Sequence, residues 1–231
     1  IFSGFDEFEY AKEAIQIEVE EYILKPIDAG NLKEVFGRIR EKIDREMDEK
    51  RNIDKLREYY MESLPILQEN FYTSLIDGRI PEDEIERYLD DYQISLTGPY
   101  YVVSILHISA TDISQNMNTF LLGVSVKKLV EEHMEDEWKS RILMYLGDIV
   151  VITQLERQDQ INAFTDFMDQ LCRLAKHVCE AIVTAGIGYV CNNLPDIRQS
   201  WQGARSAVSY RVLYGNTRAI NIAEIDPMEN A

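Results

Sequence analysis

The stretch RILMYLGDIVVITQ, residues 141–154, decides the fold of the second half of this chain. Two runs rich in β-branched and large apolar residues, 141–146 and 149–154, flank the pair Gly147-Asp148. A glycine and an acidic residue between two apolar runs are typical of a two-residue turn. The stretch therefore predicts a β-hairpin, and the elements on both sides are placed from it.

Helices and strands alternate on either side of this hairpin, as the switch between two-residue and helical apolar spacing indicates. Their order, β-α-β-β-α-β-α-β, predicts an α+β domain of ferredoxin-like or nucleotide-cyclase-like type, with its helices on one face of the sheet. Besides the hairpin, the predicted elements are a strand over 100–109, a helix over 122–133, a helix over 161–178, a strand over 181–190, a helix from 193 to 215 and a strand over 219–225.

This order, with a hairpin between two central strands, resembles GGDEF-type domains, in which diguanylate cyclases carry a Gly-Gly-Asp-Glu-Phe turn. Aligning the hairpins puts Gly147, Asp148 and Ile149 on the second glycine, the aspartate and the essential glutamate. The resemblance also places His107 and Ser109 where active relatives carry aspartates on the first strand. Phosphoryl chemistry of this type needs hard oxygen ligands for Mg²⁺. We therefore expect a divergent, non-catalytic domain with no cofactor and no metal.

A polar helix is predicted upstream, over residues 31–60. Its apolar residues recur with the alternating four- and three-residue spacing of a heptad seam, which predicts pairing with a second copy. The seam is shorter than the three to four heptads that make a coiled coil secure, so a single amphipathic helix docked on one domain stays an alternative. The seam residues are Leu32, Phe36, Ile39, Ile43 and, after the polar Glu46 and Lys50, Ile53.

The first 30 residues carry a second resemblance. The segments FSGFDEFEYA, residues 2–11, and EYILKP, residues 21–26, look like the final third of the receiver domain of a two-component response regulator. This implies part of a doubly wound α/β sheet, and a phosphorylation switch formed by Ser3, Tyr22 and Lys25. As residues alone, Tyr22 also fits plain packing and Lys25 a solvated charge. The family's acidic pair and phosphoacceptor aspartate would precede Ile1.

The segment LPILQENFYTSLIDGRIPEDEIERYLDDYQI, residues 64–94, links the two predicted domains. Its apolar spacing predicts two further amphipathic helices, one ending at Asp77-Gly78 and one with Pro81 in its first turn. It is similar to the segment that follows the receiver in response regulators ending in an AraC-type helix-turn-helix.

Composition limits the function. With 41 acidic and 24 basic residues, the net charge is −17, which repels phosphate backbones. No apolar run reaches the length of a membrane span, and no signal peptide is recognisable, so we expect a cytoplasmic protein and no membrane partner. Three cysteines without a close pair are expected to be reduced thiols.

These features predict three regions: the C-terminal part of a receiver over 1–30, a helical connector over 31–95, and a degenerate cyclase-like sensory or interaction domain over 96–231. The expected function is a fragment of a phosphorylation-responsive transcriptional regulator. Its expected partners are a second copy, a sensor histidine kinase, and DNA only through a domain that would follow Ala231. The alternatives are a cytoplasmic small-molecule sensor and, less favoured, a nucleotide cyclase.

Overall fold

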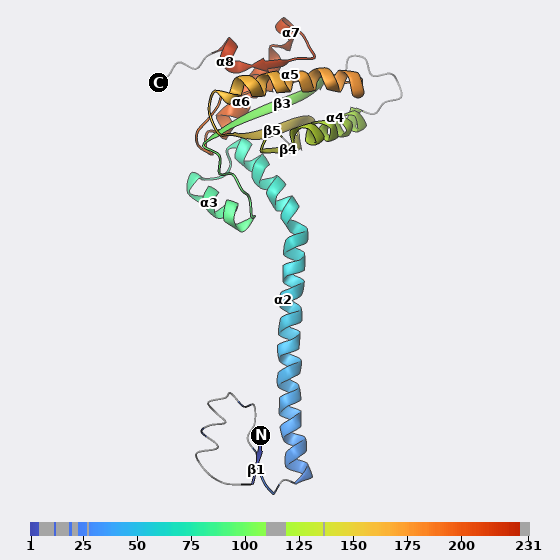
Figure 1. Cartoon of the computed structure of the whole chain (residues 1–231), viewed down its shortest axis with the longest axis vertical. Helices are drawn as coiled ribbons and strands as arrows, with labels where there is room; N and C mark the ends of the chain where they lie inside the picture. The colour runs from blue at the N-terminus through green and yellow to red at the C-terminus, as the bar shows by residue number, and fades with distance from the viewer. Residues whose placement is uncertain are drawn as a thin grey trace. The chain divides into compact units, whose positions relative to one another are not determined.

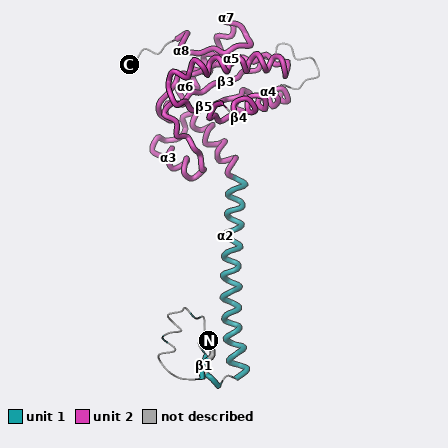
Figure 2. Tube along the Cα trace, in the orientation of Figure 1, with its two compact units in different colours: residues 1–63 teal, residues 64–231 magenta. Residues whose placement is uncertain are grey.

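The computed structural model describes residues 1–4, 12, 19, 23–26, 28–109, 119–135 and 137–226. The chain divides into two compact units, Ile1–Ser63 and Leu64–Ala231 (Figure 2). One helix, α2 (Ala29–Asp77), contributes residues to both. The three regions expected from the sequence, 1–30, 31–95 and 96–231, stay a prediction. The two compact units do not correspond to them, because they meet between Ser63 and Leu64.

In the first unit, β1 (Phe2–Ser3) pairs in parallel with β2 (Ile23–Leu24). The backbone N–H of Lys25 donates to the carbonyl of Ser3 at 2.8 Å. Parallel strands need a crossover connection, so this pairing fits the β-α-β order expected for the segment. The helix predicted between the two strands falls almost entirely outside the described residues.

Helix α2 runs for 49 residues and continues through Pro65. The prediction of two helices separated near residues 60–64 is wrong. A proline inside a helix costs about 3 kcal/mol because it removes one hydrogen bond and crowds the preceding turn. The last turns of α2 offset this cost by burying Phe71, Leu75 and Ile76 in the second unit. The next helix, α3 (Glu82–Asp91), begins directly after Pro81.

The second unit contains a five-stranded sheet (Figure 1). Only the β6–β7 pair is parallel, and the other neighbours are antiparallel. The α+β class and the predicted order of strands and helices are confirmed. Across the sheet, the strands are β4 (Ser140–Tyr145), β5 (Asp148–Leu155), β3 (Tyr100–Ser109), β6 (Ile182–Ile187) and β7 (Ala219–Asn221).

Helices cover both faces of this sheet, which corrects the prediction of helices on one face only. Alternate residues of β3 point to opposite faces: Val102 and Leu106 join one buried cluster, and Val103 and Ile105 join the other. The first cluster is covered by α4 (Thr119–Met134) and α5 (Gln160–Val178), the second by α6 (Ile197–Ser209) and the end of α2. Strands that are apolar on both faces require cover on both.

Helix α6 lies unusually close to β6, and two glycines permit it. A Cβ at Gly186 would lie 2.2 Å from the carbonyl oxygen of Ala204, and one at Gly188 would lie 1.8 Å from that of Ser200. Any larger residue would push the helix off the strand. The hydroxyl of Ser200 accepts a hydrogen bond of 2.8 Å from the backbone N–H of Val103, so α6 is also fixed to β3.

The last predicted strand, 219–225, is shorter than expected. Strand β7 ends at Asn221, and α8 (Ile222–Ile225) follows at once. The Asn221 side chain accepts from the backbone N–H of Ala223 at 3.1 Å, which caps α8 and ends the strand. A short helix, α7 (Arg211–Tyr214), also precedes Gly215. No described helix combines the length and apolar character that crossing a bilayer requires.

Candidate functional site

The candidate site lies at the hairpin end of the sheet in the second unit. The turn between β4 and β5 consists of Leu146 and Gly147, one residue earlier than predicted. Both have positive φ, 52° and 87°, which a two-residue turn of the mirror-image type requires. Asp148 is therefore the first residue of β5 and is paired with Tyr145. In this register the Asp148 side chain belongs to strand β5 and not to the turn.

The central contact of the site joins two neighbouring strands. His107 on β3 and Asp148 on β5 form a hydrogen bond of 2.8 Å between Nδ1 and Oδ1. Their side chains keep 30% and 31% of their surface exposed. By strand alternation both lie on the face that α6 and the end of α2 cover. A carboxylate beside the imidazole fixes the orientation of the ring and leaves the second ring nitrogen, Nε2, as the polar tip of the pair.

A second polar contact closes the same end of the sheet. The hydroxyl of Tyr145 donates to the carboxylate of Asp77, with its oxygen 2.7 Å and 2.8 Å from the two carboxylate oxygens. Arg79 forms an ion pair with that carboxylate. The hydrogen bond to Asp77, together with burial, raises the pKa of Tyr145, while the positive charges of Arg79 and Arg205 act in the opposite direction. Tyr145 is thus held as a neutral donor.

Helix α6 completes the wall of the site. The rings of Trp201 and Tyr145 meet edge to face, with centroids 6.2 Å apart. The guanidinium of Arg205 lies over the Trp201 ring at 5.6 Å, a distance that permits a cation–π contact. Aromatic and cationic groups therefore adjoin Tyr145, which is the cross-strand neighbour of Asp148.

The neighbouring strand β6 adds a buried hydroxyl. Thr184 is paired with His107 across the β3–β6 ladder and is fully buried. Its Oγ1 has no hydrogen-bond partner among the described residues. An unpaired buried hydroxyl costs about 1–3 kcal/mol. The site therefore holds an unused polar group beside His107, on the side away from Asp148.

The five residues predicted for the degenerate cyclase site do not all lie together in the structure. His107 and Asp148 are in contact, and Ser109, at the end of β3, is on the same face by strand alternation. Gly147 forms the turn. Ile149 is fully buried in the cluster under α4 and α5, so it faces the opposite side of the sheet.

Several site residues were not predicted. The sequence predicts Asp77 only as the end of a helix, and Trp201 only as a residue of the helix from 193 to 215. Tyr145 ends an apolar strand, and its hydroxyl contact to Asp77 spans 68 residues of sequence. No local pattern signals such a pairing.

The site does not suit Mg²⁺. Across the described residues, no group of three or more His, Cys, Asp or Glu side chains is placed to hold a metal ion. Asp148 supplies one carboxylate, already bonded to His107, and Asp77 is bonded to Tyr145 and Arg79. Mg²⁺ prefers an octahedron of oxygen ligands. Among the described residues, these carboxylates would become free ligands only if their present partners were displaced.

Comparison with protein families matches residues 77–210 to the GGDEF-like domain, over more than half of the chain. The chain belongs to the GGDEF-like domain family. The matched region begins at Asp77, includes the whole of the site described above, and ends after α6. In this GGDEF-like domain, the pair His107–Asp148 stands at the hairpin end of the central strands.

The chain is also similar to transcriptional regulators. It is 29% identical over 83 residues to the transcriptional regulatory protein HptR of Staphylococcus aureus strains NCTC 8325 / PS 47 and N315, and to the same protein of the bovine strain RF122 / ET3-1. The match covers 36% of this chain and 33% of each relative. The chain thus spans about a third of the length of the relatives that it matches.

The other predicted site residues lie in the first unit. Ser3 and Lys25 are neighbours across the β1–β2 pair, through the backbone bond described above. Tyr22 lies outside the described residues. Along α2, Phe36, Ile43 and Ile53 are exposed, whereas Leu32 and Ile39 are half-buried. The apolar stripe continues with the same spacing at Tyr60, Leu64 and Leu67.

Proposed function

We propose that this chain is a non-catalytic signalling segment of a two-component response regulator that controls transcription. Its receiver part senses phosphorylation, α2 pairs with a second copy, and the GGDEF-like domain acts as a sensory or interaction module. The partial likeness to a transcriptional regulatory protein supports the regulatory role. The parallel β1–β2 pair and the neighbouring Ser3 and Lys25 are compatible with the receiver segment.

The observation that carries the non-catalytic part is the His107–Asp148 pair. Nucleotide cyclisation needs carboxylates free to hold Mg²⁺ against phosphate oxygens. Here an imidazole occupies one strand, the adjacent carboxylate is bonded to it, and Ile149 is turned into the core. The net charge of −17 adds repulsion against a triphosphate.

The test is incubation of the chain with GTP and Mg²⁺, analysed by chromatography, with an active diguanylate cyclase as the positive control. We expect no cyclic dinucleotide. Product formation that the substitution Asp148→Asn abolishes would show that the domain is an enzyme and would refute the proposal.

A second candidate function is a small-molecule sensor, and the exposed part of the His107–Asp148 pair favours it. The imidazole, the neighbouring Tyr145 and the cationic Arg205 offer both donors and an aromatic wall to a small polar ligand. A ligand that binds only the folded state raises the melting temperature in a concentration-dependent way. A thermal shift with sugars or nucleotides that is lost in His107→Ala would support this candidate.

The remaining parts of the proposal concern partners. We assign the phosphorylation switch to Ser3, Tyr22 and Lys25, the phosphoryl source to a sensor histidine kinase, and DNA recognition to an AraC-type domain outside residues 1–231, and we place the protein in the cytoplasm. The chain itself should bind duplex DNA weakly at physiological salt, because its net charge of −17 provides no electrostatic footprint. Tight sequence-specific binding in a gel-shift assay would contradict this assignment.

A further inference from the structure

Strand β4 forms one edge of the five-stranded sheet, and its outer side has no partner strand among the described residues. Tyr145 pairs with Asp148 next to the two-residue turn, and the carbonyl of Lys139 accepts from the N–H of Gln154 at 2.9 Å. In an antiparallel ladder, every second residue directs both its N–H and its C=O to the same neighbour. Residues 139, 141, 143 and 145 therefore face β5, and Ser140, Ile142 and Met144 direct their backbone groups outward.

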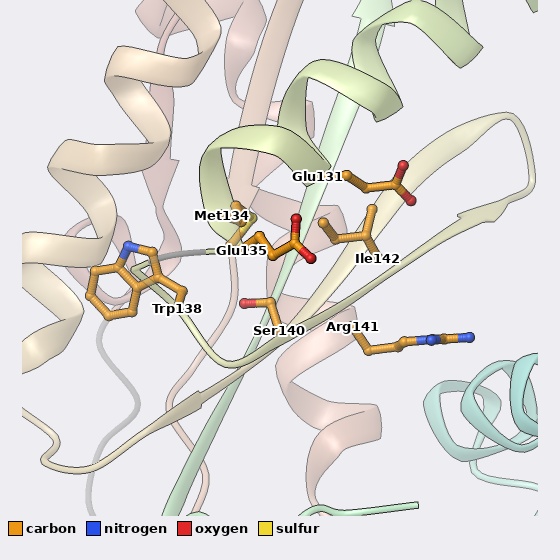
Figure 3. Close-up of a pocket in the computed structure, with 7 residues that line it drawn as sticks. All are labelled: Glu131, Met134, Glu135, Trp138, Ser140, Arg141 and Ile142. Carbon is orange, nitrogen blue, oxygen red and sulfur yellow. The ribbon is translucent and has the colours of Figure 1, made fainter.

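A groove runs beside this free edge, between β4 and the end of α4 (Figure 3). Its volume is about 410 Å³. Met134 and Ile142 provide an apolar floor, and Trp138 packs edge to face on Phe164 at 5.1 Å. The indole Nε1 of Trp138 is buried and has no hydrogen-bond partner among the described residues. The groove therefore combines an unpaired backbone edge with an apolar floor.

The rim of the groove is acidic. Figure 3 shows the carboxylates of Glu131 and Glu135 above β4, while the Arg141 side chain extends away from them. Arg141 lies over the Tyr72 ring at 5.5 Å on the opposite face of the sheet, so it does not neutralise this rim. Glu131 is paired with Lys127 at 3.0 Å. Glu135 is exposed, and no ion pair within the described ranges engages it.

From these features we infer that the edge of β4 binds an extended, basic peptide segment of a partner protein, which adds as a sixth strand. Backbone groups of Ser140, Ile142 and Met144 pair with the segment, in the mode of β-strand addition. Alternate side chains of the segment then point over the groove, where an apolar residue covers Ile142 and a lysine or arginine meets Glu135.

Charge complementarity selects this occupant over a second copy of the chain. Antiparallel pairing of β4 with its own copy would place both acidic rims on the same face of a continuous sheet, next to each other. Each copy also carries a net charge of −17. Like charges brought together are destabilising, whereas a cationic segment gains at the same position.

The test uses the full chain and labelled peptides of about ten residues, the upper length of a typical strand. One peptide alternates lysine with valine, a second alternates glutamate with valine, and a third is the lysine peptide with two central prolines. Fluorescence anisotropy is measured at about 0.15 M salt, where long-range attraction is screened. We expect that only the lysine peptide without prolines binds. The glutamate peptide is repelled by the acidic rim, and the prolines of the third peptide cannot donate hydrogen bonds to the strand.

Two matched variants locate the site on the chain. Glu135→Lys should weaken binding of the lysine peptide at least about tenfold, and Glu62→Lys, the same charge change at an exposed position of α2, by less than about twofold. Ile142→Pro should also abolish binding, because it removes an outward N–H while leaving the β4–β5 hydrogen bonds in place.

Equal binding of the lysine peptide with and without prolines would overturn the inference, and so would equal losses in Glu135→Lys and Glu62→Lys. A dimer of the parent chain that Ile142→Pro converts to monomers would overturn it in favour of a second copy on this edge. If Ile142→Pro does not fold, as judged by its circular dichroism, the peptide-side prolines and Glu135→Lys decide alone. The result does not depend on the proposed function of the hairpin site.

Discussion

Replacing Ile43 by Glu on α2 should abolish self-association of the chain. Phe36, Ile43 and Ile53 keep 55%, 49% and 64% of their surface exposed in one chain. Full burial of such a side chain contributes about 1.5–3 kcal/mol, so covering the exposed half contributes about 0.8–1.5 kcal/mol each, or about 5–9 kcal/mol for the six side chains of a pair. Association itself costs about 4–15 kcal/mol. The expected dimer is therefore weak and concentration-dependent.

In Ile43→Glu the dimer loses two of these six side chains and gains two facing carboxylates at the seam. Light scattering coupled to size exclusion, run over a range of concentrations, measures the loss directly. Tyr59→Glu is the matched control, because Tyr59 is 62% exposed on the same helix and lies away from the seam and its flanking positions. A parent chain that stays monomeric up to about 1 mM would refute the seam. So would equal disruption by Tyr59→Glu, since any added charge would then suffice.

Three further predictions concern the second unit. Tyr145→Phe should lower the free energy of unfolding by about 1 kcal/mol through loss of the hydrogen bond to Asp77. Because the fold raises the pKa of Tyr145 above its usual 10.0, this contribution is present below pH 10.0 and is lost as the pH rises through the folded pKa. The unfolding free energies of parent and variant, measured by urea titration, should therefore converge at high pH. Gly188→Ala should cost about 1–3 kcal/mol in urea unfolding, because its Cβ meets the Ser200 carbonyl, whereas Gly37→Ala, with open space around it, should stabilise α2; an unchanged Gly188→Ala would contradict the packing of α6. Burial raises the pKa of the Cys172 thiol to about 12, so mass spectrometry should find it alkylated at neutral pH only after unfolding.

The order of strands and helices in the second unit was predictable because each element carries its own periodic signal. Strand β3 coincides with its predicted bounds, since all of its residues except His107 are apolar, β-branched or small. The number of covered faces was not predictable from the α6 signal alone, because a one-sided apolar stripe does not show which face of the sheet it meets. The signal for cover on both faces is the almost unbroken apolar run of β3, whose alternate side chains join the two buried clusters.

The site was predictable in part. The family resemblance alone puts His107 and Asp148 in one site, whereas their contact follows from the pairing of β3 with β5, which no signal in the sequence specifies. The contact of Asp77 with Tyr145 was not predictable, because the two residues are 68 positions apart and no local pattern links them. The break expected near residues 60–64 was a local inference, and burial of Phe71 and Ile76 in the second unit overrides it.

The two tryptophans of the chain lie on opposite faces of one sheet, and this gives the protein two built-in optical probes. Trp138 packs in the cluster under α4 and α5, at the groove beside β4, whereas Trp201 packs on the other side against Tyr145. Their emission should therefore report different events. In Trp201→Phe, a change of fluorescence records occupancy of the β4 edge; in Trp138→Phe, it records a rearrangement at the hairpin. Signals from the two faces can thus be separated in one molecule without a dye.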